Sequence, residues 1–213
     1  MKFIFDLDGV IVHSTPLHVK AWEAYLEPLG IDSTSIGRIM LGRHNDDIVR
    51  ELFGDTLTPT EICRHGAAKE AIYREMIRPG VNEHMVPGVR PFLERYAGVD
   101  KAMASNAERA NIDCILRESG LDRFFRVVLD GNQVSRPKPD PEIYVRAAAM
   151  LDICPEECVI FEDSKAGIEA ARSAGASVVG LRTTCADLTG VDLAIDDFFA
   201  PELEEWLREQ EST

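Results

Sequence analysis

The sequence predicts an α/β fold, with a Rossmann-like parallel sheet as its core and an all-α cap domain inserted after the first strand. The main observation is a series of short apolar runs, each followed by a turn and then a helical pattern. The runs do not alternate apolar with polar residues, which is typical of strands buried on both faces of a parallel sheet. The predicted strands are residues 3–5, 101–104, 126–129, 159–161, 177–181 and 193–195.

Helices are predicted between these strands at residues 107–117, 141–151 and 164–174. Ser164 suits the start of the last helix as an N-cap, and Gly175 suits its end because glycine readily adopts the left-handed conformation found there. Strands and helices in this rhythm favour an open sheet with right-handed crossovers.

The segment from residue 14 to residue 85 breaks the rhythm because it contains no convincing strand. Apolar residues fall at helical spacing in 22–29 and 48–53, and residues 61–77 form a third helical pattern. We therefore assign 14–85 to a helical cap and join 1–13 to 86–213 in the Rossmann-like core.

The amino-acid composition limits the kinds of partner that the protein can bind. The 213 residues are 45% hydrophobic and carry a formal net charge of −14. Such a charge repels nucleic acid and anionic lipid, and no run approaches the roughly 18 apolar residues of a membrane span. We expect a cytoplasmic monomer that binds neither nucleic acid nor membrane. The same charge repels phosphate esters, so a site for one needs its own cation.

The start of the chain and its cysteines agree with a cytoplasmic location. Asp6 and Asp8 interrupt the apolar start too early for a signal peptide. The five cysteines are odd in number and match no zinc-binding spacing, so we interpret them as reduced thiols.

Carboxylates follow two of the predicted strands. Asp6 and Asp8 come directly after the first, and Glu162 and Asp163 come after residues 159–161. Ligands bind at the carboxyl edge of open α/β sheets. Asp-x-Asp alone is a common solvated turn, but several unpaired acids at one edge repel one another. Together they predict a site for Mg²⁺, which prefers hard oxygen ligands and often shares its site with a substrate phosphate.

Two further segments suit a phosphate group. Lys138 is bracketed by prolines in Arg136-Pro137-Lys138-Pro139, which stiffen the loop and restrict where the ammonium points. Ser105 and Asn106 follow the strand at 101–104 and open a helix, where a hydroxyl and backbone N–H groups can bind an anion. Each has a plainer alternative, a proline-rich turn for the first and an ordinary N-cap for the second.

These segments, in this order and spacing, resemble the four motifs of the haloacid dehalogenase superfamily. The helical insert resembles the C1-type cap of that superfamily. Phe161-Glu162-Asp163-Ser164 and Lys138-Pro139-Asp140-Pro141 are similar to the β-phosphoglucomutase-like and phosphoglycolate-phosphatase-like branch. The resemblance covers nearly the whole chain.

The resemblance implies a role for each motif residue. Asp6 would attack phosphorus to give an aspartyl-phosphate, and Asp8 would act as general acid and base. Mg²⁺ would bind the Asp6 carboxylate, the Asp8 backbone carbonyl and Asp163, with Glu162 as a further ligand or a supporting partner. The phosphate oxygens would be held by Ser105, Asn106 and Lys138, and the Lys138–Pro139 bond is a candidate for the cis form.

In the cap, the resemblance points to His18, Trp22 and Arg43 as substrate-binding residues. His18 matches a histidine that the mutases use near the general acid, although packing against Trp22 would also explain it. Arg43 lies in the loop Leu41-Gly42-Arg43-His44-Asn45, where the branch has its specificity loop, although an exposed arginine is equally plausible. His13 stands where the branch often has aspartate, and its role is open.

We therefore expect a magnesium-dependent phosphatase of small phosphorylated metabolites, such as sugar phosphates. The alternatives are a mutase of the β-phosphoglucomutase type and a non-catalytic module that binds a phosphometabolite. A mutase needs a distal cation in the cap to hold a second phosphate. By the resemblance, Asn45 stands where the mutases carry an arginine and Glu75 falls near the position of their lysine, which favours the phosphatase. Arg43 and Arg74, at adjacent positions, are candidates to replace these cations.

Overall fold

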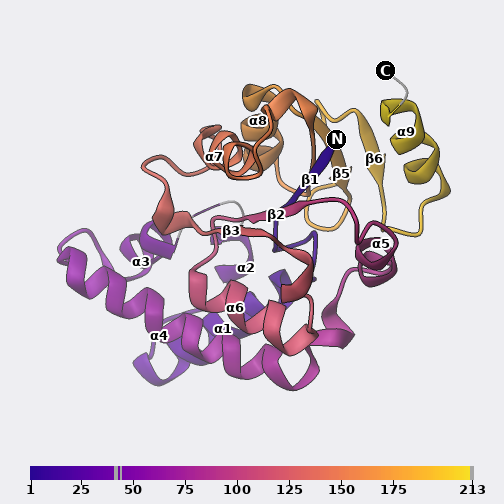
Figure 1. The fold of residues 1–213 in the computed structure, drawn as a ribbon. Helices are drawn as coiled ribbons and strands as arrows, with labels where there is room; N and C mark the ends of the chain where they lie inside the picture. Colours follow the sequence, from indigo (N-terminus) through magenta and orange to yellow (C-terminus); the bar gives the residue numbers. More distant parts are fainter. Residues whose placement is uncertain (41–42, 44, 212–213) are drawn as a thin grey trace. The chain divides into compact units, whose positions relative to one another are not determined.

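The computed structural model describes residues 1–40, 43 and 45–211. The chain divides into two compact units. One unit joins Met1–His13 to Val81–Thr213 and contains the sheet, and the other, Ser14–Gly80, is helical. Figure 1 follows the chain through both.

The sheet has six strands in the order β3-β2-β1-β4-β5-β6, and every neighbouring pair is parallel. This confirms the predicted α/β class, and each strand lies within two residues of its predicted position. The first strand, β1, is central, with Ile4 opposite Ala102 of β2 and Ile160 of β4. The strands are β1 Lys2–Phe5, β2 Lys101–Ala104, β3 Val127–Leu129, β4 Cys158–Glu162, β5 Ser177–Leu181 and β6 Leu193–Ile195.

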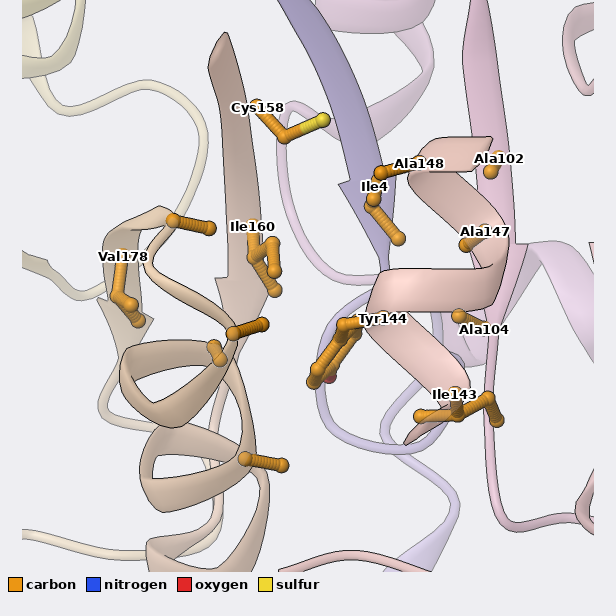
Figure 2. Packing of buried hydrophobic residues seen from close by; sticks show 14 of the residues in the cluster. Ile4, Ala102, Ala104, Ile143, Tyr144, Ala147, Ala148, Cys158, Ile160 and Val178 are labelled. Atoms are coloured by element: carbon orange, nitrogen blue, oxygen red, sulfur yellow. The ribbon is translucent and has the colours of Figure 1, made fainter. Parts of the chain in front are cut away.

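Both faces of the sheet are buried, which explains why the strands are apolar throughout. On one face, Ile4 and Ile160 pack against the helices α7 (Glu142–Met150) and α8 (Lys165–Ala174), in the layer shown in Figure 2. The opposite face is aromatic, because alternate residues of a strand point to opposite sides. There Phe5 stacks on Phe161, with ring centroids 4.6 Å apart, and both contact Phe92 of α5 (Val89–Arg95).

The helices of this unit follow the predicted rhythm. The Ser164 hydroxyl accepts a hydrogen bond from the Gly167 N–H at 3.0 Å at the start of α8, and Gly175 ends that helix with φ of 89°. Both end signals were therefore predicted correctly. The helices are α5 Val89–Arg95, α6 Arg109–Ser119, α7 Glu142–Met150, α8 Lys165–Ala174 and α9 Pro201–Glu211, with 3-10 turns at η3 Asp122–Phe124, η4 Gly131–Gln133 and η5 Pro155–Glu157.

The described residues of the second unit form helices joined by turns and loops, with no strand. Its core packs Trp22 and Leu26 of α1 against Ile48 and Val49 of α3 and Ile62 of α4. Its elements are α1 Thr15–Leu26, η1 Glu27–Leu29, α2 Ile36–Ile39, α3 Asn45–Phe53 and α4 Pro59–Ile77. Across the described part of the chain, no helix combines the length and the apolar character that a membrane span requires.

The helical unit ends at Gly80, whereas the sequence placed residues 81–85 in the cap. The 3-10 segment η2 Arg78–His84 leads out of it. The His13 N–H then donates to the His84 carbonyl at 2.7 Å, and Val12 forms an antiparallel bridge with Met85. Pairing with the chain that leaves β1 is thus what places residues 81–85 with the sheet.

Candidate active site

Neighbouring strands deliver the predicted motif residues to one edge of the sheet. Asp6 follows β1, Ser105 follows β2, and Asp163 follows β4, whose last residue is Glu162. Because parallel strands end on the same side, these side chains share the carboxyl edge, where open α/β sheets bind ligands. Lys138 joins them from the loop that precedes α7.

The loop after β1 presses directly against Asp163. The Asp6 N–H donates to the Phe161 carbonyl at 3.1 Å, which ties the start of the loop to β4. Gly9 has φ of 77°, and a Cβ at this position would lie 1.8 Å from Asp163 Oδ2. A glycine is therefore required both by the backbone conformation and by the nearby carboxylate.

Lys138 is the buried cation of this cluster. Its Nζ lies 2.7 Å from Asp6 Oδ1 and 2.6 Å from Glu162 Oε1, and the Lys138–Pro139 peptide bond is cis. Burial by itself would lower the pKa of Lys138, but the charges of Asp6 and Glu162 outweigh burial and raise it. The ammonium therefore remains protonated at neutral pH.

The cluster carries excess negative charge. Its carboxylates are those of Asp6, Asp8, Glu162 and Asp163, and its ammonium is that of Lys138. Burial, with the charges of Glu162 and Asp8, raises the pKa of Asp6 to about 7 although Lys138 opposes the rise. Burial and the charges of Glu162 and Asp6 likewise raise the pKa of Asp163 well above its usual value. Both shifts have the sign expected for a site built to receive another cation.

Glu162 supports the site rather than offering free oxygens to a metal. Oε1 accepts hydrogen bonds from Lys138 Nζ and from the Tyr144 hydroxyl, each at 2.6 Å. Oε2 accepts from the N–H of Asp163 at 2.9 Å and from the N–H and hydroxyl of Ser164 at 3.1 Å. Of the two roles that the resemblance left open, ligand or supporting partner, this geometry favours the second.

Ser105 and Asn106 lie beside the lysine loop. The Ser105 hydroxyl is buried and accepts a hydrogen bond from the Ala107 N–H at 3.2 Å. Asn106 Oδ1 accepts from the backbone N–H of Lys138 at 3.4 Å. The segment after β2 therefore helps to hold the loop that carries the ammonium.

Two residues of this edge were missed by the sequence reasoning. The Thr183 hydroxyl donates to the Gly9 carbonyl at 2.6 Å and lies 3.4 Å from Asp163 Oδ2. It follows β5, so the rule that identified the other strand ends could have found it. Tyr144 lies within α7, and only the fold brings its hydroxyl to Glu162. Burial, and then the charge of Glu162, raise the pKa of Tyr144 well above its usual value, so the phenol stays protonated.

The oxygens at this edge fit magnesium. Among the described residues, no group of three or more His, Cys, Asp and Glu side chains is arranged to hold a metal ion. Mg²⁺ does not need such a group, since it usually binds one or two carboxylates together with water and substrate phosphate. Asp6 and Asp163 are two such carboxylates, and both lie in an environment that penalises their negative charge.

The predicted substrate-binding residues lie in the helical unit. Trp22 is fully buried in its core, which favours a packing role. Arg43 binds Glu51 and donates to the Asp47 carbonyl at 3.2 Å. The neighbours of Arg43 in the predicted specificity loop, Leu41, Gly42 and His44, lie outside the described residues.

His18 belongs to a buried polar network that the sequence reasoning did not detect. Its Nδ1 is 2.8 Å from Lys69 Nζ, and its ring stacks on Tyr73 at 3.8 Å between centroids. Lys69 also donates to Glu70 Oε1 at 2.8 Å, and Asn45 donates to the same oxygen at 2.6 Å. The helical unit therefore contains a buried lysine, but a carboxylate accompanies it.

His13, whose role the sequence left open, lies where the chain leaves β1. Burial lowers the pKa of His13, and the neighbouring His84 lowers it further. The contact between the two residues is made by their backbones, which agrees with a structural role for residue 13.

Comparisons with known proteins agree with the geometry. The family model for haloacid dehalogenase-like hydrolases matches residues 3–175. The chain is 34% identical over 180 residues to the phosphorylated carbohydrates phosphatase of Thermotoga maritima, covering 81% of this chain and 80% of that protein. It is 30% identical over 184 residues to the β-phosphoglucomutase of Bacillus subtilis, covering 84% and 81%. A mutant of CbbY from Rhodobacter sphaeroides, solved in complex with xylulose-(1,5)bisphosphate, has a TM-score of 0.81 and 26% identity over 92% of this chain and 94% of that one.

Proposed function

The chain belongs to the haloacid dehalogenase-like hydrolases, and from this premise we propose that it is a magnesium-dependent phosphatase that hydrolyses small phosphorylated carbohydrates through a phosphoaspartate on Asp6. The observation that carries the proposal is the environment of Asp6. Its carboxylate is buried at the carboxyl edge of the sheet and lies 2.7 Å from the ammonium of Lys138. The substrate class is inferred from the Thermotoga maritima relative, which is named for phosphorylated carbohydrates.

In the proposed reaction, Asp6 forms a bond to phosphorus while the bond from phosphorus to the ester oxygen breaks. Asp8 gives its proton to the leaving oxygen, so the first product is an alcohol. Water then forms the next bond to phosphorus and gives a proton to Asp8 as the bond to Asp6 breaks. The second product is inorganic phosphate, and both aspartates return to their starting forms.

The other residues hold the phosphate group in place. Lys138, Ser105 and Asn106 would bind its oxygens, where a positioned ammonium and hydroxyl stabilise charge in the transition state. The carboxylates of Asp6 and Asp163 and the backbone carbonyl of Asp8 would hold Mg²⁺, which supplies neutralisation of charge on the transferring group.

A hydrolysis assay over a panel of sugar phosphates tests this function. We expect phosphate release with Mg²⁺, none with excess EDTA, and none from Asp6→Asn under any condition. Beryllium fluoride with Mg²⁺, as a mimic of phosphoaspartate, should raise the melting temperature of the wild type because a ligand of the native state stabilises it. Full activity in EDTA, or an equal response of Asp6→Ala to beryllium fluoride, would refute the assignment.

A sugar-phosphate mutase is the second candidate, and the Bacillus subtilis relative supports it. Lys69 also supports it, since it gives the helical unit a buried cation beside His18. Two observations favour the phosphatase. Glu70 pairs with Lys69, and Asn45 stands where the mutases carry an arginine, so the net positive charge needed to hold a second phosphate is reduced.

Separating the two products decides between these candidates. The protein is incubated with β-glucose 1-phosphate, a trace of the 1,6-bisphosphate and Mg²⁺, while glucose 6-phosphate and free phosphate are measured independently. We expect phosphate release without isomerisation. Rapid formation of glucose 6-phosphate with little free phosphate would establish the mutase instead. A protein that binds phosphate but forms neither product here, and releases no phosphate from any ester of the panel, would be the non-catalytic module.

A further inference from the structure

Tyr144 touches both members of the ion pair between Lys138 and Glu162. It is fully buried, and its hydroxyl donates to Glu162 Oε1 at 2.6 Å. The Lys138 ammonium lies over the tyrosine ring, 4.7 Å from its centroid. One side chain therefore binds the anion through its hydroxyl and the cation through its ring.

We propose that Tyr144 is a positioning residue, which holds Glu162 and thereby directs the ammonium of Lys138 toward the phosphate-binding edge. The inference rests on the proposed function, because phosphate is the ligand assigned to Lys138. Tyr144 does not touch the reacting atoms and acts only through its two neighbours.

The hydrogen bonds of Glu162 explain why a hydroxyl matters here. Oε2 is already held by the N–H groups of Asp163 and Ser164, which fixes one end of the carboxylate. Oε1 is shared between the Tyr144 hydroxyl and the Lys138 ammonium. Without the hydroxyl, the Lys138 ammonium would be the remaining donor to Oε1 among the described residues, and charge-assisted bonds are the stronger kind. Lys138 would then be drawn toward Glu162 and away from Asp6, which lies 2.7 Å away on its other side.

The ring adds a second restraint. An aromatic face attracts a cation, more strongly where water is excluded. Figure 2 shows Tyr144 on α7, where it belongs to the same packed layer as Ile143 and Ala147 of that helix. Since α7 directly follows the proline loop that carries Lys138, a short stretch of chain supplies both the cation and the residue that orients it.

Tyr144→Phe tests the hydroxyl while keeping the ring. With p-nitrophenyl phosphate and Mg²⁺, we expect kcat to fall about tenfold, as for the loss of one hydrogen bond to a charged group, and KM to change by less than about twofold. Tyr96→Phe is the matched control, because it removes a similar bond, from the Tyr96 hydroxyl to Glu204 at 2.9 Å, elsewhere in the same unit. The control should keep the wild-type kcat. A Tyr144→Phe enzyme with wild-type kcat would overturn the inference.

A double-mutant cycle separates positioning through Glu162 from a purely structural role. If Tyr144 acts through the carboxylate, adding Tyr144→Phe to Glu162→Gln should reduce kcat by less than about twofold further. Losses that multiply in the double variant would show that the two residues act independently and would reject the inference.

A phosphate-binding assay allows the inference on Tyr144 to be tested separately from the proposed function. If the wild type hydrolyses no phosphate ester, the proposed function fails, and inorganic phosphate with Mg²⁺ becomes the probe. The rise in melting temperature on adding phosphate should then be larger for the wild type than for Tyr144→Phe. The control Tyr96→Phe should show the same rise as the wild type. An equal rise in wild type and Tyr144→Phe would overturn the inference on Tyr144.

Discussion

At the scale of single residues, charge is the dominant feature of the site. The ammonium of Lys138 is shared by two buried carboxylates, those of Asp6 and Glu162. Burial, together with the negative charges of Glu162 and Asp8, raises the pKa of Asp6 even though this cation is adjacent. The charged cluster therefore lowers the stability of the metal-free fold, as functional sites commonly do; the ligands proposed for it are a cation and a phosphate.

The pKa of Asp6 predicts how stability depends on pH without metal. Folding raises that pKa from 3.8 to about 7, so between these values the folded protein binds more protons than the unfolded chain. The free energy of unfolding should therefore fall as pH rises through this window. Asp6→Asn removes the charge, so at pH 8 it should melt above the wild type, by about 2–4 °C for each kcal/mol gained.

Melting curves of both proteins in EDTA from pH 4 to pH 8 make this measurement. The difference between wild type and Asp6→Asn should shrink steadily toward the acid end, because near pH 3.8 Asp6 is protonated in the folded protein and about half protonated in the unfolded chain. A wild type that gains stability relative to Asp6→Asn as pH rises would contradict the raised pKa.

Removal of the buried ammonium should destabilise the fold. Lys138→Met leaves two buried carboxylates without their cation, which costs about 3–5 kcal/mol for a buried pair. Lys165→Met is the matched control, because Lys165 pairs with Asp187 at 3.2 Å on the surface and such pairs contribute about 0–1 kcal/mol. Urea unfolding of the two variants checks the prediction, and equal losses would show that burial does not govern the Lys138 pair.

At the scale of elements, α8 is placed so that its first turn closes over Glu162. A Cβ at Gly167 would lie 1.8 Å from Glu162 Oε1, so the helix can approach the carboxylate only through a glycine. The approach lets the Ser164 hydroxyl donate to Glu162 while it also caps α8. The helix start and the buried carboxylate therefore depend on the same residue.

Two glycine-to-alanine changes distinguish this contact from helix propensity. Gly167→Ala should displace Glu162, lower the melting temperature and reduce phosphatase activity at least tenfold, an effect equal to roughly 1.4 kcal/mol of transition-state stabilisation. Gly66→Ala, in α4, would place its Cβ 3.6 Å from the Asn45 Cβ, an ordinary contact. It should stabilise the protein by up to about 1 kcal/mol, because alanine is the better helix former. Thermal melts and kcat measurements on both variants check these two expectations. A Gly167→Ala variant that is stabilised and active would contradict the contact between the helix and Glu162.

At the scale of the whole molecule, the chain forms two units. The sheet unit consists of two segments of the chain, and these two segments are in contact where the helical segment is inserted between them. The His13 N–H and the His84 carbonyl are hydrogen bonded, so the helical segment leaves and returns at adjacent points. The unit with the sheet also has apolar layers of its own on both faces. It meets the requirements of an independently folding domain.

Replacing residues 14–80 by a Gly/Ser linker of about four residues should therefore leave the sheet unit folded. We expect a cooperative melt and a rise in melting temperature with beryllium fluoride and Mg²⁺, since the residues proposed to bind them lie in this unit. We also expect loss of discrimination among sugar phosphates, because the predicted substrate-binding residues are removed. A shortened protein with no cooperative melt would show that the sheet unit depends on the helical one.

Sequence alone was sufficient where the signal was local. Apolar runs and helical periodicity predicted all six strands and the α/β class, because burial on both faces imposes a continuous apolar run on each strand. The helix ends at Ser164 and Gly175 were equally local, since a cap depends on a few neighbouring residues. The rule that parallel strands present their ends at one edge predicted that Asp6, Asp8 and Asp163 would lie together, and the resemblance added Ser105.

Only the tertiary structure decided what depends on distant residues meeting. Oε1 of Glu162 is occupied by a lysine 24 positions away and by a tyrosine inside α7, and no local pattern reveals that the carboxylate is already satisfied. The buried Lys69 carries no local signal within its helical segment, and only the fold brings it against His18 of α1. Residues 81–85 joined the sheet unit because of pairing with residues 12 and 13. In each case the physical reason is that hydrogen bonds and charges act through space, whereas periodicity records only neighbours along the chain.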